Sequence, residues 1–104
     1  MRSTLLRIAF GVGCLFAVSA AAHTPLLDCY KNDDGTITCE GGFSDGASAA
    51  GVEIRIIDEI DRVVLKGKLD DDAQFTFEEP DFDYHVIFDA GSNHVVVLFG
   101  GEIE

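Results

Sequence analysis

Basic residues are scarce in this 104-residue sequence, which has seven Lys and Arg against 19 Asp and Glu, a formal net charge of −12. Nucleic-acid binding depends on clustered Lys and Arg that contact phosphates, so this balance argues against it. It argues equally against docking on anionic lipid head groups. Long apolar segments are missing too, because no run approaches the roughly 20 residues that span a membrane. The length corresponds to one small domain, since domains usually have about 50–200 residues.

The N-terminal 22 residues have the pattern of an export signal. Arg2 and Arg7 precede an almost wholly apolar run, Ile8–Val18, and four small residues follow it. A positive start, a short apolar run and a small-residue exit are typical of a secretory signal peptide. One alternative is a membrane anchor, for which the run is too short. The other is a lipoprotein signal, but Cys14 lies in the middle of the run and Gly11 stands where a branched apolar residue is expected. We expect residues 1–22 to be a signal peptide and 23–104 to be a single exported domain, periplasmic or secreted.

Two cleavage points satisfy the preference for small residues before the cut. One follows Ala20 and leaves Ala21 first, and the other follows Ala22 and leaves His23 first. Removing 22 of the 104 residues leaves 82, with five basic and 19 acidic side chains and a formal charge of −14. Either way the exported chain keeps two cysteines, Cys29 and Cys39.

These two cysteines flank a predicted β-hairpin. If Asp33–Gly35 form a three-residue loop, with its glycine at positive φ, then Asn32 faces Thr36 and Cys29 faces Cys39. Cross-strand neighbours are close enough for a disulfide, which an oxidising compartment favours. A metal-thiolate pair is the alternative.

The rest of the exported chain alternates with a period of two. Apolar residues alternate with polar ones along 52–56, 63–69 and 75–77, with acidic turns between them, whereas Gly41–Gly51 has the composition of a loop. No segment sustains a helical stripe over ten residues. The prediction is an all-β protein, a small antiparallel β-sandwich of the immunoglobulin or transthyretin type.

The last two strands are predicted to form a hairpin around Ala90–Asn93. A four-residue loop makes Asp89 face His94. One face of the pair is then wholly apolar and is expected in the core: Tyr84, Val86, Phe88, Val95, Val97 and Phe99. The other face is half-apolar, with Ile87 opposite Val96 and His85 opposite Leu98, so we expect the hairpin either to be central or to be covered by a loop or partner.

Three stretches, Gly51–Ile56, Gly67–Phe77 and Tyr84–Phe88, resemble the transthyretin-like, carboxypeptidase-regulatory-like β-sandwich. In that family a strand carries an Asp-x-Asp-Gly turn into a Phe-x-Phe strand. The match covers about half of the exported chain, and Ala73 stands where the family has glycine.

A narrower resemblance rests on His23–Pro25, the cysteine hairpin and Phe88–His94. These segments are similar to small exported accessory proteins of bacterial nickel and cobalt uptake systems. The resemblance implies a protein without catalysis that handles metal outside the cytoplasmic membrane, in partnership with a membrane transporter.

The residues themselves predict a metal-binding terminus. Cleavage before His23 would join a free amine and an imidazole on one residue, and both nitrogens can chelate one cation. Cleavage before Ala21 would place His23 third, where amine, two amides and imidazole can surround Cu(II) or Ni(II) in a plane. His94 is the expected further ligand and Asp89 the carboxylate that orients or joins it, whereas His85 lies too far along its strand and is expected to be structural. Nitrogen ligands suit Ni, Co and Cu without choosing among them, and the alternative is that these histidines are ordinary surface residues.

Other chemistries fit less well. Placing Gly35 sixth in an EF-hand loop puts Tyr30 first and Gly41 twelfth, where acids are required, so the turn is not a calcium site. No nucleophile–base pair is separable from the general acidity, so we expect no enzyme. The predicted function is an exported metal-binding accessory protein that presents Ni, Co or Cu to a membrane transporter. The alternative is an interaction module without metal that binds a protein partner or itself through the last hairpin.

Overall fold

A computed structural model describes residues 23–104, which form seven strands and one short 3-10 helix. The expected signal peptide, residues 1–22, lies outside the described residues. The elements are β1 (Pro25–Lys31), β2 (Thr36–Phe43), β3 (Glu53–Asp58), β4 (Val63–Lys68), β5 (Gln74–Glu78), β6 (Tyr84–Asp89), β7 (Val95–Phe99) and η1 (Gly100–Glu102). Within residues 23–104 no helix is long and apolar enough to cross a membrane.

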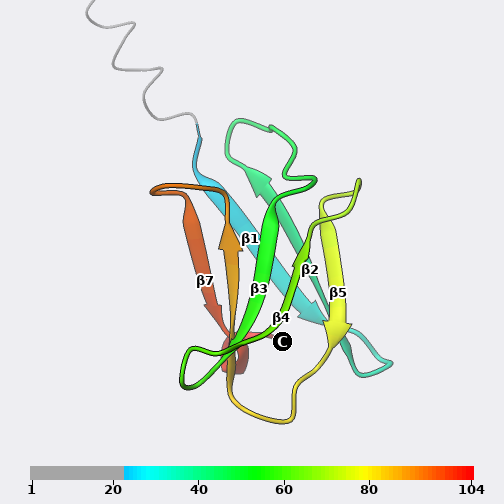
Figure 1. The fold of residues 1–104 in the computed structure, drawn as a ribbon. Helices are drawn as coiled ribbons and strands as arrows, with labels where there is room; N and C mark the ends of the chain where they lie inside the picture. The colour runs from blue at the N-terminus through cyan, green and yellow to red at the C-terminus, as the bar shows by residue number, and fades with distance from the viewer. Residues whose placement is uncertain (1–22) are drawn as a thin grey trace, which may run out of the picture.

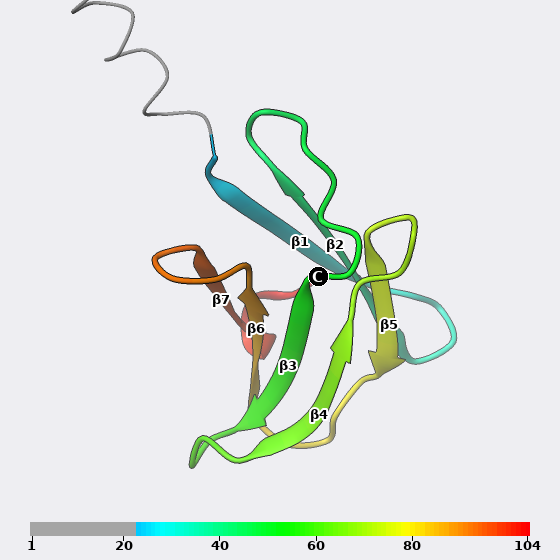
Figure 2. The same ribbon diagram turned by 45° about the horizontal axis from the view of Figure 1, so that its top comes forward.

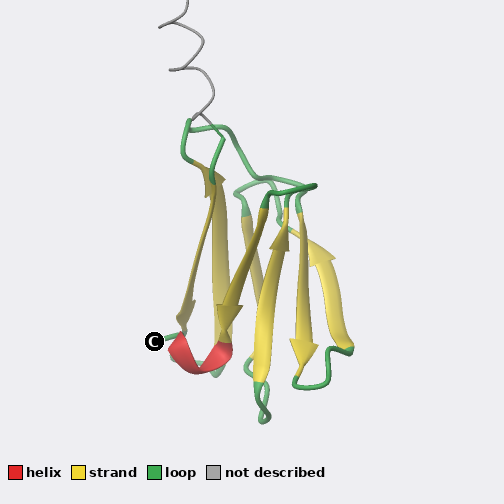
Figure 3. Ribbon diagram, turned by 90° about the vertical axis from the view of Figure 1, so that its left-hand side faces the viewer, coloured by secondary structure: helices red, strands yellow, loops and turns green. Residues whose placement is uncertain are grey.

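The strands form two antiparallel sheets, as the sequence predicted for a small β-sandwich. Sheet A has the order β1-β2-β5 and sheet B the order β4-β3-β6-β7. Figures 1 and 2 show β1 beside β7 at one margin of the molecule and β5 beside β4 at the other. The turns gather at the two ends of the strands, and η1 lies at one of these ends (Figure 3).

The core lies between the sheets and follows the predicted period of two. In β3, Ile54 and Ile56 are fully buried, and in β6, Val86 and Phe88 are fully buried opposite them. Sheet A contributes Ile37, which is also fully buried. Each such side chain contributes roughly 1.5–3 kcal/mol through removal of apolar surface from water.

Strand β2 continues further than the sequence suggested. Gly41 and Gly42 belong to the strand rather than to the expected loop, which begins after Phe43. A Cβ on Gly41 would lie 2.6 Å from Cδ1 of Leu69 and 3.0 Å from Cε1 of Phe88. The missing side chain therefore lets the strand lie directly against core side chains, and a loop-like composition serves a packing role here.

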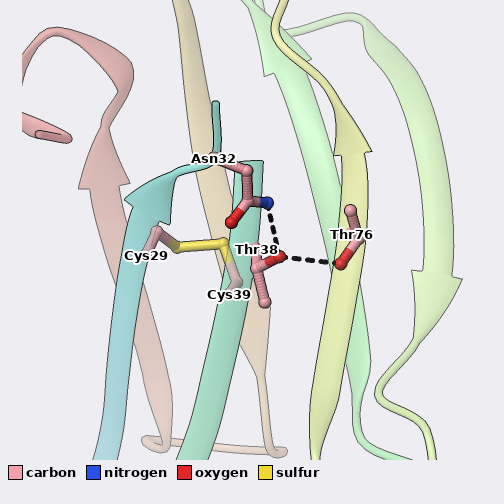
Figure 4. Close-up of a disulfide and its surroundings, with 5 residues drawn as sticks. All are labelled: Cys29, Asn32, Thr38, Cys39 and Thr76. Carbon is pink, nitrogen blue, oxygen red and sulfur yellow. Dashed lines mark hydrogen bonds between the residues drawn. A yellow bond between two sulfur atoms is a disulfide. The ribbon is translucent and has the colours of Figure 1, made fainter. Parts of the chain in front are cut away.

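The β1–β2 hairpin has the predicted turn and register. The Asn32 amide donates to the Thr36 carbonyl at 2.8 Å, and Gly35 has a φ of +85°. Cys29 pairs with Cys39 across the strands, and a disulfide joins them (Figure 4).

A series of side-chain hydrogen bonds crosses sheet A beside the disulfide. The Asn32 side-chain amide donates to Thr38 Oγ1 at 2.9 Å, and the hydroxyls of Thr38 and Thr76 lie 2.8 Å apart (Figure 4). Thr38 is buried, so this network satisfies a polar group that would otherwise destabilise the sheet.

The β6–β7 register differs from the prediction by one residue. The Ala90 amide donates to the His94 carbonyl at 2.9 Å, which closes a three-residue loop, Gly91–Asn93, whose last residue has a φ of 63°. Asp89 therefore lies opposite Val95, and the prediction that it faces His94 was wrong. Asparagine tolerates the left-handed conformation that a three-residue loop requires, and this made the shorter loop possible.

A shift of one residue inverts the faces of a strand. The buried face of β6 was predicted correctly, but Val96 and Leu98 of β7 pack against the core in place of their neighbours. Val95, Val97 and Phe99 point outward and are 49%, 47% and 52% exposed. The apolar composition of β7 concealed its orientation, because every residue in it could have faced the core.

Candidate metal site at the start of strand β1

The structure does not place the predicted ligands Asp89 and His94 opposite each other. His94 lies in the β6–β7 turn, where its Nδ1 lies 2.7 Å from the Ser92 carbonyl oxygen. Asp89 Oδ2 accepts a hydrogen bond from the Arg55 guanidinium at 3.0 Å, and its Oδ1 accepts one from the Gly91 amide. The carboxylate of Asp89 is therefore engaged on the outer face of sheet B.

These hydrogen bonds also favour the ionised form of the Asp89 carboxyl group. The Arg55 hydrogen bond, followed by the Gly91 amide, lowers the pKa of Asp89 below the ordinary 3.8. Arg55 also pairs with Glu53, whose other oxygen lies 3.4 Å from Nζ of Lys66. Asp89 is thus one member of a charge network that crosses three strands.

His85 lies apart from both. Its ring packs in a tilted arrangement against Phe99, with centroids 4.6 Å apart, on the outer face of sheet B. This contact is consistent with the structural role expected for it.

His23 has a partner that the sequence did not reveal. Its Nδ1 lies 2.8 Å from Oδ2 of Asp45, with the His23 side chain 68% exposed and that of Asp45 26% exposed. One backbone hydrogen bond continues the β1–β2 pairing beyond Pro25↔Phe43, since the Ser44 amide donates to the Thr24 carbonyl at 2.9 Å. The side-chain contact between His23 and Asp45 lies just beyond it, where the chain has entered the turn after β2.

Local hydrogen bonds hold both sides of this pair. The Thr24 amide donates to Ser44 Oγ at 3.0 Å, which ties the residue after His23 to the β2 side. Asp45 Oδ1 accepts from the Ala47 amide at 3.0 Å, so Oδ2 is the oxygen that faces the imidazole. The sequence signal for Asp45 is the Asp45–Gly46 turn. When the β1–β2 register set by the cysteines is extended toward the N-terminus, this turn falls beside His23.

The pair places two potential metal donors side by side. At 2.8 Å the contact has the length of a hydrogen bond or ion pair, and after loss of the shared proton the same two atoms could become neighbouring ligands of one ion. Within the described part of the chain, no group of three or more His, Cys, Asp or Glu side chains could hold a metal. The side chains therefore supply two donors, and a third would have to come from the chain terminus.

No family model, curated protein or solved structure compared with the chain matches it. The case for this site therefore rests on the placement of His23 and Asp45. The resemblance to nickel and cobalt accessory proteins is carried only by the residues named for it above.

Proposed function

We propose that the chain is an exported protein, periplasmic or secreted, that captures a divalent Ni, Co or Cu ion at its processed N-terminus and presents it to a membrane transporter. The observation that carries the proposal is the 2.8 Å contact between His23 Nδ1 and Asp45 Oδ2. The Cys29–Cys39 disulfide supports the exported location, because such bonds persist in oxidising compartments.

Cleavage before His23 completes a three-donor site. The new α-amine and Nδ1 of the same residue chelate one ion, and the Asp45 carboxylate adds an anionic oxygen on the Nδ1 side. Metal binding displaces the proton that the Nδ1–Asp45 contact shares. Since the amine has a pKa near 8, its proton is also displaced at modest cost near pH 7.

Exposure of the site supports delivery rather than storage. The imidazole of His23 is two-thirds exposed at one end of the sandwich, where an acceptor protein can reach the ion. A site with few protein donors also leaves coordination positions open for the ligands of a transporter.

The test is a titration of the exported protein with Ni(II), Co(II) and Cu(II) by calorimetry, after its first residue has been determined by intact mass. His23→Ala abolishes binding. If His23 is the first residue, Asp45→Asn weakens binding about tenfold, as expected for loss of one ligand contact. If Ala21 is first, four nitrogens surround the ion and Asp45→Asn has little effect.

Two matched variants control the titration. Asp71→Asn makes the same change of charge at an exposed turn and leaves the affinity unchanged. His94→Ala removes the histidine of the β6–β7 turn and also leaves the affinity unchanged, because Nδ1 of His94 faces the Ser92 carbonyl oxygen rather than the pair. Equal losses in His23→Ala and His94→Ala, or no binding tighter than about micromolar, would refute the proposed site.

One observation favours a second function, an interaction module. Strand β7 is an edge of sheet B, carries no charge, and presents Val95, Val97 and Phe99 half exposed. Uncharged apolar edge strands promote pairing with another chain. If β7 mediates self-association, sedimentation equilibrium detects a dimer that Val97→Lys converts to a monomer, whereas a monomer at all concentrations excludes it.

A further inference from the structure

A groove opens at the opposite margin of the sandwich, between the edge strands β4 and β5. Figure 2 shows these two strands side by side. The volume of the groove is about 750 Å³. Apolar side chains from both sheets line it, with acidic residues at the β5 end: Ile56, Leu65, Phe77, Glu78, Glu79 and Asp81. It is separate from both the His23 site and β7.

The groove gathers exposed apolar surface. Val64, Leu65 and Phe82 line it while remaining 46%, 41% and 42% exposed. A smaller hollow shares Val64 and Phe82 with the groove and adds Ile60, which is 68% exposed. Contiguous apolar patches on a small protein usually mark a binding surface.

The backbone of β5 is also available along this groove. The Gly41 amide donates to the Ala73 carbonyl at 3.0 Å, and the Glu79 amide donates to the β1–β2 turn at 3.0 Å. Since antiparallel strands direct alternate residues to each side, the odd-numbered residues of β5 bond to β2. The backbone groups of Thr76 and Glu78 therefore point toward the groove.

The charge of the groove selects a partner. Three acidic residues line it and no basic one does, among the residues that the structure describes. Glu79 is paired with Lys31 at 3.2 Å, but Glu78 and Asp81 have no ion-pair partner within residues 23–104. A basic segment would meet opposite charges here, whereas the uncharged strand β7 of a second copy would gain no charge complementarity.

We propose that this groove binds an extended segment of a partner protein in which apolar residues alternate with Lys or Arg. The segment adds as a fourth strand to sheet A, paired with the backbone of Thr76 and Glu78. Its apolar side chains point between the sheets and cover Phe77 and Leu65. Its basic side chains point outward, beside Glu78, because alternate residues of a strand face opposite sides.

This proposal does not depend on metal binding, and its test uses peptides. The probe is a capped heptapeptide of alternating Lys and Val, titrated into the 15N-labelled exported protein while amide shifts are followed. It binds at least about tenfold more tightly than a block isomer of the same composition or an alternating Glu and Val peptide, a difference of about 1.4 kcal/mol. The largest shifts occur at Thr76 and Glu78, and methylation of alternate peptide amides removes binding because it removes the donors.

Matched variants locate the site. Val64→Lys abolishes binding, whereas Val95→Lys, at a valine of similar exposure on β7, does not. Glu78→Gln weakens binding about two- to fivefold and Glu102→Gln leaves it unchanged. Equal binding of the block isomer, shifts centred on β7, or Thr76 shifts that depend on protein concentration without peptide would overturn the proposal, the last by indicating self-association.

Discussion

Reduction of the Cys29–Cys39 disulfide tests how much of the stability this cross-link supplies. The two cysteines are 10 positions apart in the sequence and both are buried in the core. For a loop of this length, the chain-entropy relation gives about 2.7 kcal/mol at 25 °C. An unfolding entropy of roughly 2.1 cal/mol/K per residue, over about 80 residues, converts this into a fall in Tm of about 15 °C. For a domain this small, such a loss is a large share of the total stability.

The assay is thermal unfolding by circular dichroism with and without a phosphine reductant, with the free thiols counted afterwards. Cys29→Ala/Cys39→Ala should reproduce the fall without reductant and should be insensitive to it. A fall of less than about 4 °C in fully reduced protein would show that the loop-closure argument is wrong here.

Three further substitutions have defined outcomes. The buried hydroxyl of Tyr84 has no hydrogen-bond partner among residues 23–104, so Tyr84→Phe should raise the free energy of unfolding by about 1 kcal/mol in urea denaturation, and a loss would mean that the hydroxyl is satisfied. Hydrogen bonds from the Arg62 amide and side chain lower the pKa of Asp58, so its contribution to stability is present above the unfolded pKa near 3.8 and is lost as pH falls through the folded pKa. Asp58→Asn should therefore flatten the acid limb of stability against pH, and an unchanged limb would contradict this assignment. Gly41→Ala should destabilise by about 1–3 kcal/mol through overpacking, whereas Gly42→Ala, with open space around the new methyl, should be nearly neutral.

The first hairpin could be predicted from the sequence because its turn residues left one register. Asp33–Gly35 place a glycine at the single position that needs positive φ, and the cysteines then face each other. The alternation along β3 and β6 likewise identified the buried Ile54, Ile56 and Phe88.

The last hairpin could not be predicted in the same way. The sequence from Ala90 to His94 permits either a three- or a four-residue loop. Because β7 is apolar at every position, both registers place apolar side chains in the core, and composition does not exclude the wrong one. The four-residue loop was therefore the wrong choice, and Asp89 lies opposite Val95 rather than opposite His94.

The partner of His23 was missed for a different reason. Asp45 belongs to a segment rich in small residues, and its position depends on β2 continuing through Gly41 and Gly42. That continuation is a tertiary effect, set by the contact of the glycine backbone with Leu69 and Phe88, and no local propensity indicates it. The contact between His23 and Asp45 can be predicted only when the full extent of the β1–β2 pairing is known.

The most direct test of the proposed metal site is calorimetric titration of the exported protein with Ni(II) and Cu(II), with the first residue known from intact mass. If His23 is first, the wild-type protein should bind one ion, His23→Ala should bind none, and Asp45→Asn should bind about tenfold more weakly than Asp71→Asn. If all four proteins bind alike, or if none binds more tightly than about micromolar, His23 and Asp45 do not form a metal site.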